Sequence, residues 1–250
     1  MRKVLGIFGL CWKLHIGVTF VVTAIFFYPI IFPFLLSEKG KVRAFKLFVA
    51  WSWVFRTLCL YFVKKVKNEK LPDGPYLIVA NHISYLDIFF MYSIFPRQHF
   101  LFLGKSEILS YPLIKTYFKR LNIPVYRGNR IKAAKSLVHA AREVKKGWSM
   151  VIFPEGKIPD ENPKMARFKA GAFQLAKTVN LPIVPVTFTN NHLLFSDPTF
   201  ILGPARPGVS KVHVHQFIPA EKVAELDQEE LIKECFDLVN QPIIDRYGEL

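Results

Sequence analysis

Cysteine and acidic residues are scarce in this chain of 250 residues. Only three cysteines occur, at widely separated positions (Cys11, Cys59 and Cys235), so the sequence excludes a disulfide framework and indicates a reducing compartment. Asp and Glu number 19 against 34 Lys and Arg, which gives a formal net charge of +15. A balance this positive requires an anionic partner: nucleic acid, anionic lipid or a phosphorylated substrate.

Charged residues are absent from Leu14 to Ser37. This uncharged stretch is apolar and long enough for a hydrocarbon core of about 30 Å. Pro29 and Pro33 lie in its second half, where they predict that a helix kinks or ends. With 51% hydrophobic residues in the whole chain, the sequence also excludes a disordered protein.

A second apolar run, from Leu47 to Val63, carries a single charge at Arg56. It contains Trp51, Trp53 and Tyr61, which are residue types favoured at a membrane interface. Lys and Arg residues precede, separate and follow the two apolar runs. Positive charge on every flank gives no preference for one side of a membrane.

We predict that residues 1–64 form a helical hairpin that dips into one leaflet and is held there by its basic flanks. Two alternatives remain open: a pair of helices that both span the bilayer, and a hairpin buried in a soluble core. A cleaved signal peptide is not favoured, because the apolar segment is too long and no small-residue cleavage site follows it.

Residues 65–250 predict an α/β domain, in which a mixed sheet is covered by helices. The domain begins in the charged, turn-rich segment 64–75. Pro124 and Pro185 place their strands at an edge or a bulge, and Asp227 with Glu230 predicts a capping box. The expected strands are 76–80, 99–103, 122–126, 149–153, 182–188 and 211–217. The expected helices are 86–94, 107–119, 131–146, 168–179 and 227–246.

His82 and Asp87 follow the first of these expected strands. Chemistry in α/β sheets gathers at the carboxyl ends of strands. A carboxylate five residues after a histidine can hold one imidazole nitrogen, which leaves the other to act as a general base on a hydroxyl. Taken alone, however, this pair more often means that His caps a strand end and Asp caps a helix.

Three more strand ends carry candidate residues. Glu155 and Gly156 form a sharp turn after 149–153, where the carboxylate could bind a substrate hydroxyl or tether a neighbouring loop. Lys105 follows 99–103 and Arg127 follows 122–126. Two cations near the His and Glu turns would make an anion pocket, although each cation alone is typical of a solvated surface. His213 and His215 share a strand face, but no third metal ligand lies near them, so we expect no metal site.

Together these segments resemble the glycerolipid acyltransferase superfamily. The resemblance rests on four motifs in the family's order: NHISYLD at 81–87, NIPVYRGN at 122–129, FPEG at 153–156 and IVPVTF at 183–188. GKSEI at 104–108 and FKAGAF at 168–173 also resemble flanking segments of the family. With the apolar N-terminal segment, the chain is similar to bacterial 1-acylglycerol-3-phosphate acyltransferases.

The resemblance implies an O-acyltransferase of phospholipid biosynthesis, with lysophosphatidic acid as the acceptor and phosphatidic acid as the product. It implies His82 and Asp87 as the catalytic pair, with backbone N–H groups near this box stabilising the oxyanion. The implied substrate-binding residues are Asn81, Ser84, Lys105, Arg127, Glu155 and Gly156. No cofactor or metal is implied, since acyl-CoA or an acyl-carrier-protein thioester would be the donor substrate. The implied location is the cytoplasmic face of the plasma membrane, with the lipid bilayer as a partner.

One departure leaves the acceptor open. The family usually has Thr-Arg-Ser after the FPEG motif, whereas this chain has Lys157-Ile158-Pro159. Lys157 or Arg167 could supply the missing charge, or the acceptor could be another lysolipid. A non-enzymatic membrane-binding protein is a further alternative. Nucleic-acid binding is not expected, because much of the positive charge brackets apolar segments and no nucleic-acid motif is present.

Overall fold

A seven-stranded mixed sheet forms the centre of the molecule, in the order β1-β7-β6-β2-β5-β3-β4. The structure is a computed structural model that describes residues 2–126 and 128–249, with only the backbone described at 2–4, 112, 113 and 130. Strands β6, β2, β5, β3 and β4 pair in parallel, so their carboxyl ends share one edge of the sheet. β7 runs antiparallel to β6, and β1 runs parallel to β7. The strands are β1 Tyr61–Asn68, β2 Leu77–Ala80, β3 Phe100–Lys105, β4 Ile123–Val125, β5 Ser149–Ile152, β6 Ile183–Phe188 and β7 Gly208–Val214.

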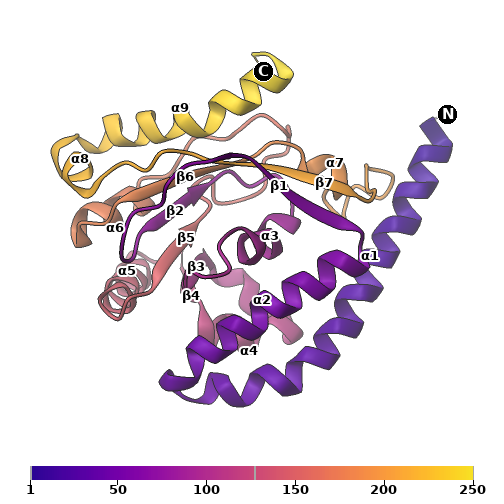
Figure 1. Cartoon of the computed structure of the whole chain (residues 1–250), viewed down its shortest axis with the longest axis horizontal. Helices are drawn as coiled ribbons and strands as arrows, with labels where there is room; N and C mark the ends of the chain where they lie inside the picture. Colours follow the sequence, from indigo (N-terminus) through magenta and orange to yellow (C-terminus); the bar gives the residue numbers. More distant parts are fainter. Residues whose placement is uncertain (1, 127, 250) are drawn as a thin grey trace.

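Helices lie on both sides of this sheet (Figure 1). In that view α9 lies above the sheet, and the N-terminal pair α1 and α2 lies below it, with α3 between the sheet and α2. The α-helices are α1 Arg2–Ile31, α2 Lys41–Leu58, α3 Leu86–Ile94, α4 Pro112–Leu121, α5 Arg130–Lys145, α6 Gly171–Val179, α7 Asn191–Leu194, α8 Ala220–Glu225 and α9 Gln228–Tyr247. Short 3₁₀ helices are η1 Phe32–Leu36, η2 Glu38–Gly40 and η3 Ser106–Ser110.

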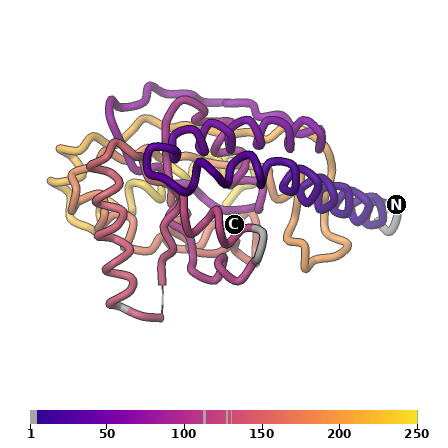
Figure 2. Tube along the Cα trace, turned by 90° about the horizontal axis from the view of Figure 1, so that it is seen from below, coloured from indigo at the N-terminus to yellow at the C-terminus, as the bar shows by residue number. Residues whose placement is uncertain are grey.

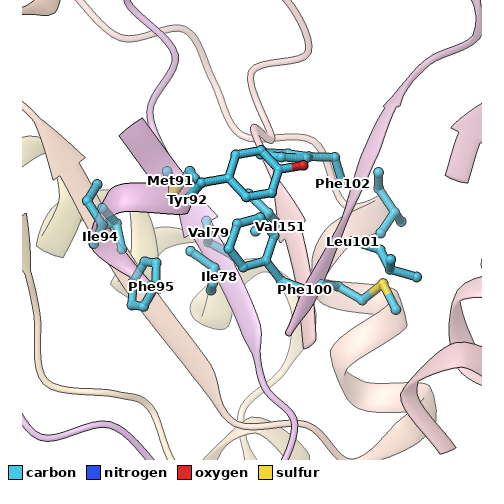
Figure 3. Packing of buried hydrophobic residues seen from close by; sticks show 14 of the residues in the cluster. Ile78, Val79, Met91, Tyr92, Ile94, Phe95, Phe100, Leu101, Phe102 and Val151 are labelled. Atoms are coloured by element: carbon cyan, nitrogen blue, oxygen red, sulfur yellow. The ribbon is translucent and has the colours of Figure 1, made fainter. Parts of the chain in front are cut away.

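Near the edge where the carboxyl ends of the parallel strands meet, the core consists of large apolar side chains from β2, β3, β5 and α3 (Figure 3). All four residues of β2 are buried, as expected for an interior strand covered on both faces. Tyr92 on α3 packs against Phe100 and Phe102 of β3, with ring centroids 5.0 and 5.8 Å apart. This packing fixes α3 relative to the end of β2, where the chain turns between the two elements.

The predicted fold class is confirmed, and each of the six expected strands is present within a few residues of its predicted limits. Asp227 and Glu230 form the expected capping box at the start of α9. Pro124 lies in the edge strand β4. Pro185 lies instead in the interior strand β6, where the β6–β7 ladder breaks between the Val186–Val214 pair and an isolated Ile183–Ile218 bridge. Its missing N–H therefore costs no regular ladder bond.

The N-terminal hairpin differs from the prediction at its second helix. The apolar run 47–63 is not one helix, because α2 ends at Leu58 and Leu60 takes a left-handed conformation (φ 50°) before β1 begins at Tyr61. Strand β1 crosses the boundary expected between residues 64 and 65, so the hairpin leads directly into the sheet. In the first helix, α1 ends at Ile31 and 3₁₀ turns follow around Pro33, as the two prolines predicted.

Aromatic packing ties the hairpin to the α/β part. Trp51 and Tyr61, which we expected at an interface, are buried, and only Trp53 is half exposed. Trp51 on α2 donates a 2.9 Å hydrogen bond to Thr23 Oγ1 on α1 and packs edge-on against Phe89 on α3. Helix α2 thus lies between α1 and α3, with its inner faces covered by protein.

Helix α1 keeps an apolar outer face. Among the described residues, one helical segment, Leu5–Leu36, is long and apolar enough to cross a membrane, with a mean hydropathy of 2.2. Only 33% of its most apolar window is buried. Figure 2 shows the N-terminal half of α1 reaching beyond the sheet and its other helices. The apolar outer face supports membrane association of the chain.

Candidate active site

His82 and Asp87 are in contact at the carboxyl end of β2. His82 lies two residues after the last residue of β2, and Asp87 lies in the first turn of α3. The Nδ1 atom of His82 is 2.9 Å from Oδ2 of Asp87. The Asp87 side chain is fully buried, and the His82 side chain is 13% exposed. The pair therefore has one solvent-accessible member, the imidazole, backed by an inaccessible carboxylate.

Backbone groups of the same turn fix the Asp87 carboxylate. Oδ2 of Asp87 also accepts hydrogen bonds from the N–H groups of Ile83 (2.8 Å) and Ser84 (2.9 Å). A carboxylate that accepts these bonds acts as the acceptor toward His82 too, so Nδ1 of His82 carries the proton. Nε2 is then the basic nitrogen, and no described residue hydrogen bonds to it.

Asn191, which sequence reasoning missed, completes the support of Asp87. Its Nδ2 donates a 2.7 Å hydrogen bond to Oδ1 of Asp87. Asn191 begins α7, shortly after the carboxyl end of β6, and β6 is paired in parallel with β2. The sequence offered one signal, the position of Asn191 three residues after the expected strand 182–188. The structure shows that its side chain is fully buried. Both oxygens of Asp87 are therefore held, one by α7 and one by its own turn.

Glu155 ties two loops together. After β5, Oε1 of Glu155 accepts the N–H of His82 (2.7 Å), and Oε2 accepts the N–H of Ala166 (2.8 Å). Burial raises the pKa of Glu155 to about 7, although both hydrogen bonds act in the opposite direction. The geometry thus favours the tethering role over direct contact with a substrate hydroxyl. Gly156 has a φ of 82°, a left-handed value that glycine adopts without strain, and so completes the turn.

Phe153 forms one wall of the site. Its ring stacks on the His82 imidazole, with centroids 4.2 Å apart and planes 18° apart. The contact limits rotation of the imidazole about its side-chain bonds. Phe153 lies within the FPEG motif, but the sequence alone did not indicate this role.

Asn81 and Ser84 have structural partners. Both polar ends of the Asn81 side chain bind the backbone of Phe188 in β6, at 2.9 and 2.7 Å. Ser84 donates from Oγ to the carbonyl of Phe195 (2.7 Å). Both residues are almost completely buried, so they hold the His82 turn against the segment after β6.

Of the two expected cations, Lys105 lies at the same edge of the sheet. Lys105 ends β3 and is exposed. Because β5 alone separates β3 from β2, the ends of β3 and β2 lie about 10 Å apart, or two strand spacings. Arg127 lies outside the described residues. Lys157 forms an exposed ion pair with Asp160 (2.5 Å), whereas Arg167 follows Ala166, whose N–H binds Glu155.

The expectation that backbone N–H groups near the His82 box stabilise the oxyanion is not supported by the geometry. The N–H groups of His82, Ile83 and Ser84 all donate to carboxylates, so they are not free to stabilise an oxyanion. His213 in β7 and His215 just after it stack on each other. Nε2 of His215 is hydrogen bonded to Oγ1 of Thr187 at 2.8 Å. Across the described ranges, no group of three or more His, Cys, Asp or Glu could hold a metal ion.

Comparisons with known proteins identify the family of the chain. The Acyltransferase family model matches residues 62–189, just over half of the chain. The chain is 29% identical over 238 residues to the chloroplastic 1-acyl-sn-glycerol-3-phosphate acyltransferase of Brassica napus, covering 93% of this chain and 67% of that protein. It is 31% identical over 212 residues to a putative 1-acyl-sn-glycerol-3-phosphate acyltransferase of Caenorhabditis elegans, covering 83% and 72%.

A solved structure shares the fold. The crystal structure of the 1-acyl-sn-glycerophosphate (LPA) acyltransferase PlsC from Thermotoga maritima aligns with a TM-score of 0.76 at 22% identity, covering 100% of this chain and 99% of that one. The fold and the family match define an acyltransferase enzyme. The chain belongs to the glycerolipid acyltransferase family, as its four motifs indicated.

Proposed function

We propose that this enzyme transfers a fatty acyl group from an acyl thioester to the free hydroxyl of 1-acylglycerol-3-phosphate, giving phosphatidic acid. The observation that carries the proposal is the 2.9 Å contact between His82 Nδ1 and Asp87 Oδ2, with Nε2 of His82 not hydrogen bonded to any residue that the structure describes. The names of the relatives support the acceptor, since those proteins are 1-acyl-sn-glycerol-3-phosphate acyltransferases.

The proposed chemistry begins with His82 as a general base. Nε2 takes the proton of the acceptor hydroxyl as its oxygen forms a bond to the thioester carbonyl carbon. The tetrahedral intermediate collapses, the carbon–sulfur bond breaks, and the imidazolium returns its proton to the leaving thiolate. General base assistance of this kind contributes about 10²–10⁴-fold to a rate. Asp87 stabilises the imidazolium and keeps the proton on Nδ1 in the resting state.

The donor is the activated reactant, so the proposal includes no metal or prosthetic group. The thioester is acyl-CoA or an acyl-carrier-protein thioester. Lys105 and Arg127 are the proposed contacts for the acceptor phosphate, and Glu155 and Gly156 shape the acceptor side of the site through the loop that they hold. Guanidinium and ammonium groups suit a phosphate because both offer charge-assisted hydrogen bonds.

We further propose that the enzyme works on the cytoplasmic face of the plasma membrane, with the hairpin embedded in one leaflet. Helix α2 packs against α1 and against α3. It therefore cannot face lipid on all sides, as an independent membrane-spanning helix would. The outer face of α1 remains apolar and exposed, which supports insertion from one side.

The test follows consumption of a labelled acyl thioester with lysophosphatidic acid, for the wild type and His82→Ala. We expect the wild type to form phosphatidic acid and the variant to lose at least about 100-fold in kcat with an unchanged thermal midpoint. Activity near the wild-type level in a folded His82→Ala protein would exclude the general-base role. Wild-type protein that turns over neither CoA nor carrier-protein thioesters would remove the proposal itself.

A second candidate acceptor is another lysolipid, such as a lyso-aminolipid or a lysophospholipid. The observation that favours it is Lys157-Ile158-Pro159 in place of the family's usual Thr-Arg-Ser. A panel of acceptors at equal surface concentration distinguishes the two: a kcat/KM higher for a lysophospholipid than for lysophosphatidic acid would assign the enzyme to that acceptor.

A further inference from the structure

The loop between α7 and β7 exposes three consecutive large apolar side chains. A bridge between Phe195 and Ala205 closes this loop at its base. At its tip Phe200, Ile201 and Leu202 are 63%, 61% and 59% exposed. Single exposed apolar residues are common, whereas a contiguous apolar patch marks an interaction surface. We refer to residues 196–204 as the tip loop.

The tip loop is fastened to the first turns of α1. Lys13 Nζ donates to the carbonyls of Asp197 (3.2 Å) and Phe200 (2.5 Å). A Cβ on Gly9 would lie 3.0 Å from the carbonyl oxygen of Gly203, so glycine at position 9 allows the two backbones to approach closely. Figures 1 and 2 both show the orange loop beside the N-terminal half of α1.

The outer face of α1 continues this apolar surface. Leu5, Ile7 and Phe8, in the same turns of α1, are 64%, 60% and 49% exposed. Farther along the helix His15 is an exposed polar residue. The other large side chains exposed there are apolar: Leu14, Val18, Val21, Val22, Ile25, Phe26 and Ile30. The tip loop therefore widens the apolar face of the one helix that is long and apolar enough to enter a membrane.

The base of the tip loop is bonded to the active site. Ser84, between His82 and Asp87, donates to the carbonyl of Phe195 at 2.7 Å. This hydrogen bond joins the His82 turn to the residue that directly precedes the tip loop. An anchor at the tip would therefore fix the distance between His82 and the surface that the tip enters.

We propose that the tip loop is a second membrane-inserting element, which enters the same leaflet as α1 and holds the mouth of the active site at the lipid surface. This inference rests on the proposed acylation of a membrane lipid. A bilayer fits this surface because its apolar side chains are continuous with α1. Arg206, exposed just after the loop, complements anionic headgroups. A long-chain acceptor could then present its hydroxyl to His82 while its acyl chain stays in the leaflet.

The main test compares the triple variant F200S/I201S/L202S with the wild type. The control is I131S/V138S on α5, which removes side chains that are 70% and 53% exposed from another part of the surface. Two acceptors are assayed: oleoyl lysophosphatidic acid in phosphatidylglycerol–phosphatidylcholine vesicles, and hexanoyl lysophosphatidic acid below its micelle concentration. We expect the triple variant to lose about tenfold or more in vesicle partitioning and in kcat/KM on vesicles. Its kcat/KM for the monomeric acceptor should stay within about twofold of the wild type, and the control should match the wild type in both assays.

A second measurement reports insertion directly. Phe200→Cys is labelled with an environment-sensitive fluorophore in a Cys11→Ser background, because Cys59 and Cys235 are buried. We expect a blue shift and a gain in intensity on adding the vesicles, and neither change for a label at Val138→Cys. The readout needs no catalytic turnover, so it is independent of the proposed function.

Two results would overturn the inference. One is a triple variant that matches the wild type in vesicle partitioning and in vesicle kinetics, with no blue shift at position 200. The other is a triple variant that changes only from a dimer to a monomer by light scattering, which would assign the patch to a second copy of the chain. If the wild type acylates no acceptor but the label still inserts, the proposed function fails while the membrane contact stands.

Discussion

The carboxyl edge of the sheet and the N-terminal hairpin hold their residues by different forces. At the edge Asp87 is fully buried and accepts hydrogen bonds from His82, Asn191 and two backbone N–H groups. A buried carboxylate is tolerated only when its oxygens are paired in this way. In the hairpin the contacts are mainly between aromatic rings, as where Trp51 packs on Phe89. The site is thus held by directional hydrogen bonds, and the hairpin is held by the burial of apolar surface.

The largest effect should come from a substitution that changes the hydrogen bonds of Asp87 without changing the size of its side chain. Asp87→Asn keeps the size of the side chain but places an amide where the N–H groups of Ile83, Ser84 and His82 converge. The amide has one acceptor oxygen in place of two and no negative charge to stabilise the His82 imidazolium, so we expect kcat to fall about 10³–10⁴-fold. Pre-steady-state acyl transfer measures this loss. A fall of less than tenfold would mean that Asp87 does not orient His82.

A comparison of two tryptophans tests whether burial of apolar surface stabilises the N-terminal hairpin. Trp51 is 4% exposed and Trp53 is 49% exposed, although the sequence predicted an interfacial place for both. Trp51→Ala should lower the free energy of unfolding by about 3–5 kcal/mol, because it leaves a cavity among α1, α2 and α3. Trp53→Ala is the matched control and should cost less than about 1 kcal/mol. Equal losses in urea unfolding would show that α2 is not packed as described.

The same contrast explains what the sequence could predict. The His82, Glu155 and Lys105 positions followed from strand ends, since a short continuous apolar run and the polar residue after it are local signals. Strand β1 was missed because its segment, YFVKKVKN, is basic, and it pairs with β7 far away in the chain. The roles of Asn191 and Phe153 were missed for the same reason. Their contacts with Asp87 and His82 depend on how β6 and β5 pair with β2, which no local pattern contains.

The Glu155 carboxyl should make stability depend on pH. Burial raises its pKa from 4.5 to about 7, so the folded state binds this proton more tightly than the unfolded state does. The resulting stability is complete below about pH 4.5 and is lost as the pH rises through about 7. Between these limits the wild type should lose up to about 3 kcal/mol relative to Glu155→Gln, which cannot titrate. Denaturant titrations at half-unit pH steps measure the difference, and parallel curves for the two proteins would contradict the assignment.

Substitutions at two adjacent asparagines distinguish a residue that supports the active site from one that supports the sheet. Asn191→Ala leaves Oδ1 of Asp87 without its described side-chain donor, which should cost about 1–3 kcal/mol, or roughly 5- to 150-fold in kcat. Asn190→Ala removes bonds to Val209 and Lys211 in β7 and should lower only the thermal midpoint. The pH–rate profile of Asn191→Ala should also shift, because the carboxylate facing His82 is less well held. An unchanged profile and kcat would leave Asn191 a purely structural residue.

The smallest expected effect concerns the acceptor phosphate, where this chain departs from its family. Lys157 is held by Asp160 on an exposed turn, whereas Arg167 adjoins the backbone that Glu155 binds. Arg167→Gln should therefore raise KM for lysophosphatidic acid about tenfold, with kcat nearly unchanged, since one charge-assisted contact is worth about 1.5–3 kcal/mol before solvent screening. Lys157→Gln should remain close to the wild type. The Arg167→Gln effect should disappear with monoacylglycerol, which has no phosphate for the guanidinium to bind. A larger effect at Lys157 would place the phosphate on the outer turn, away from the loop that Glu155 ties to His82.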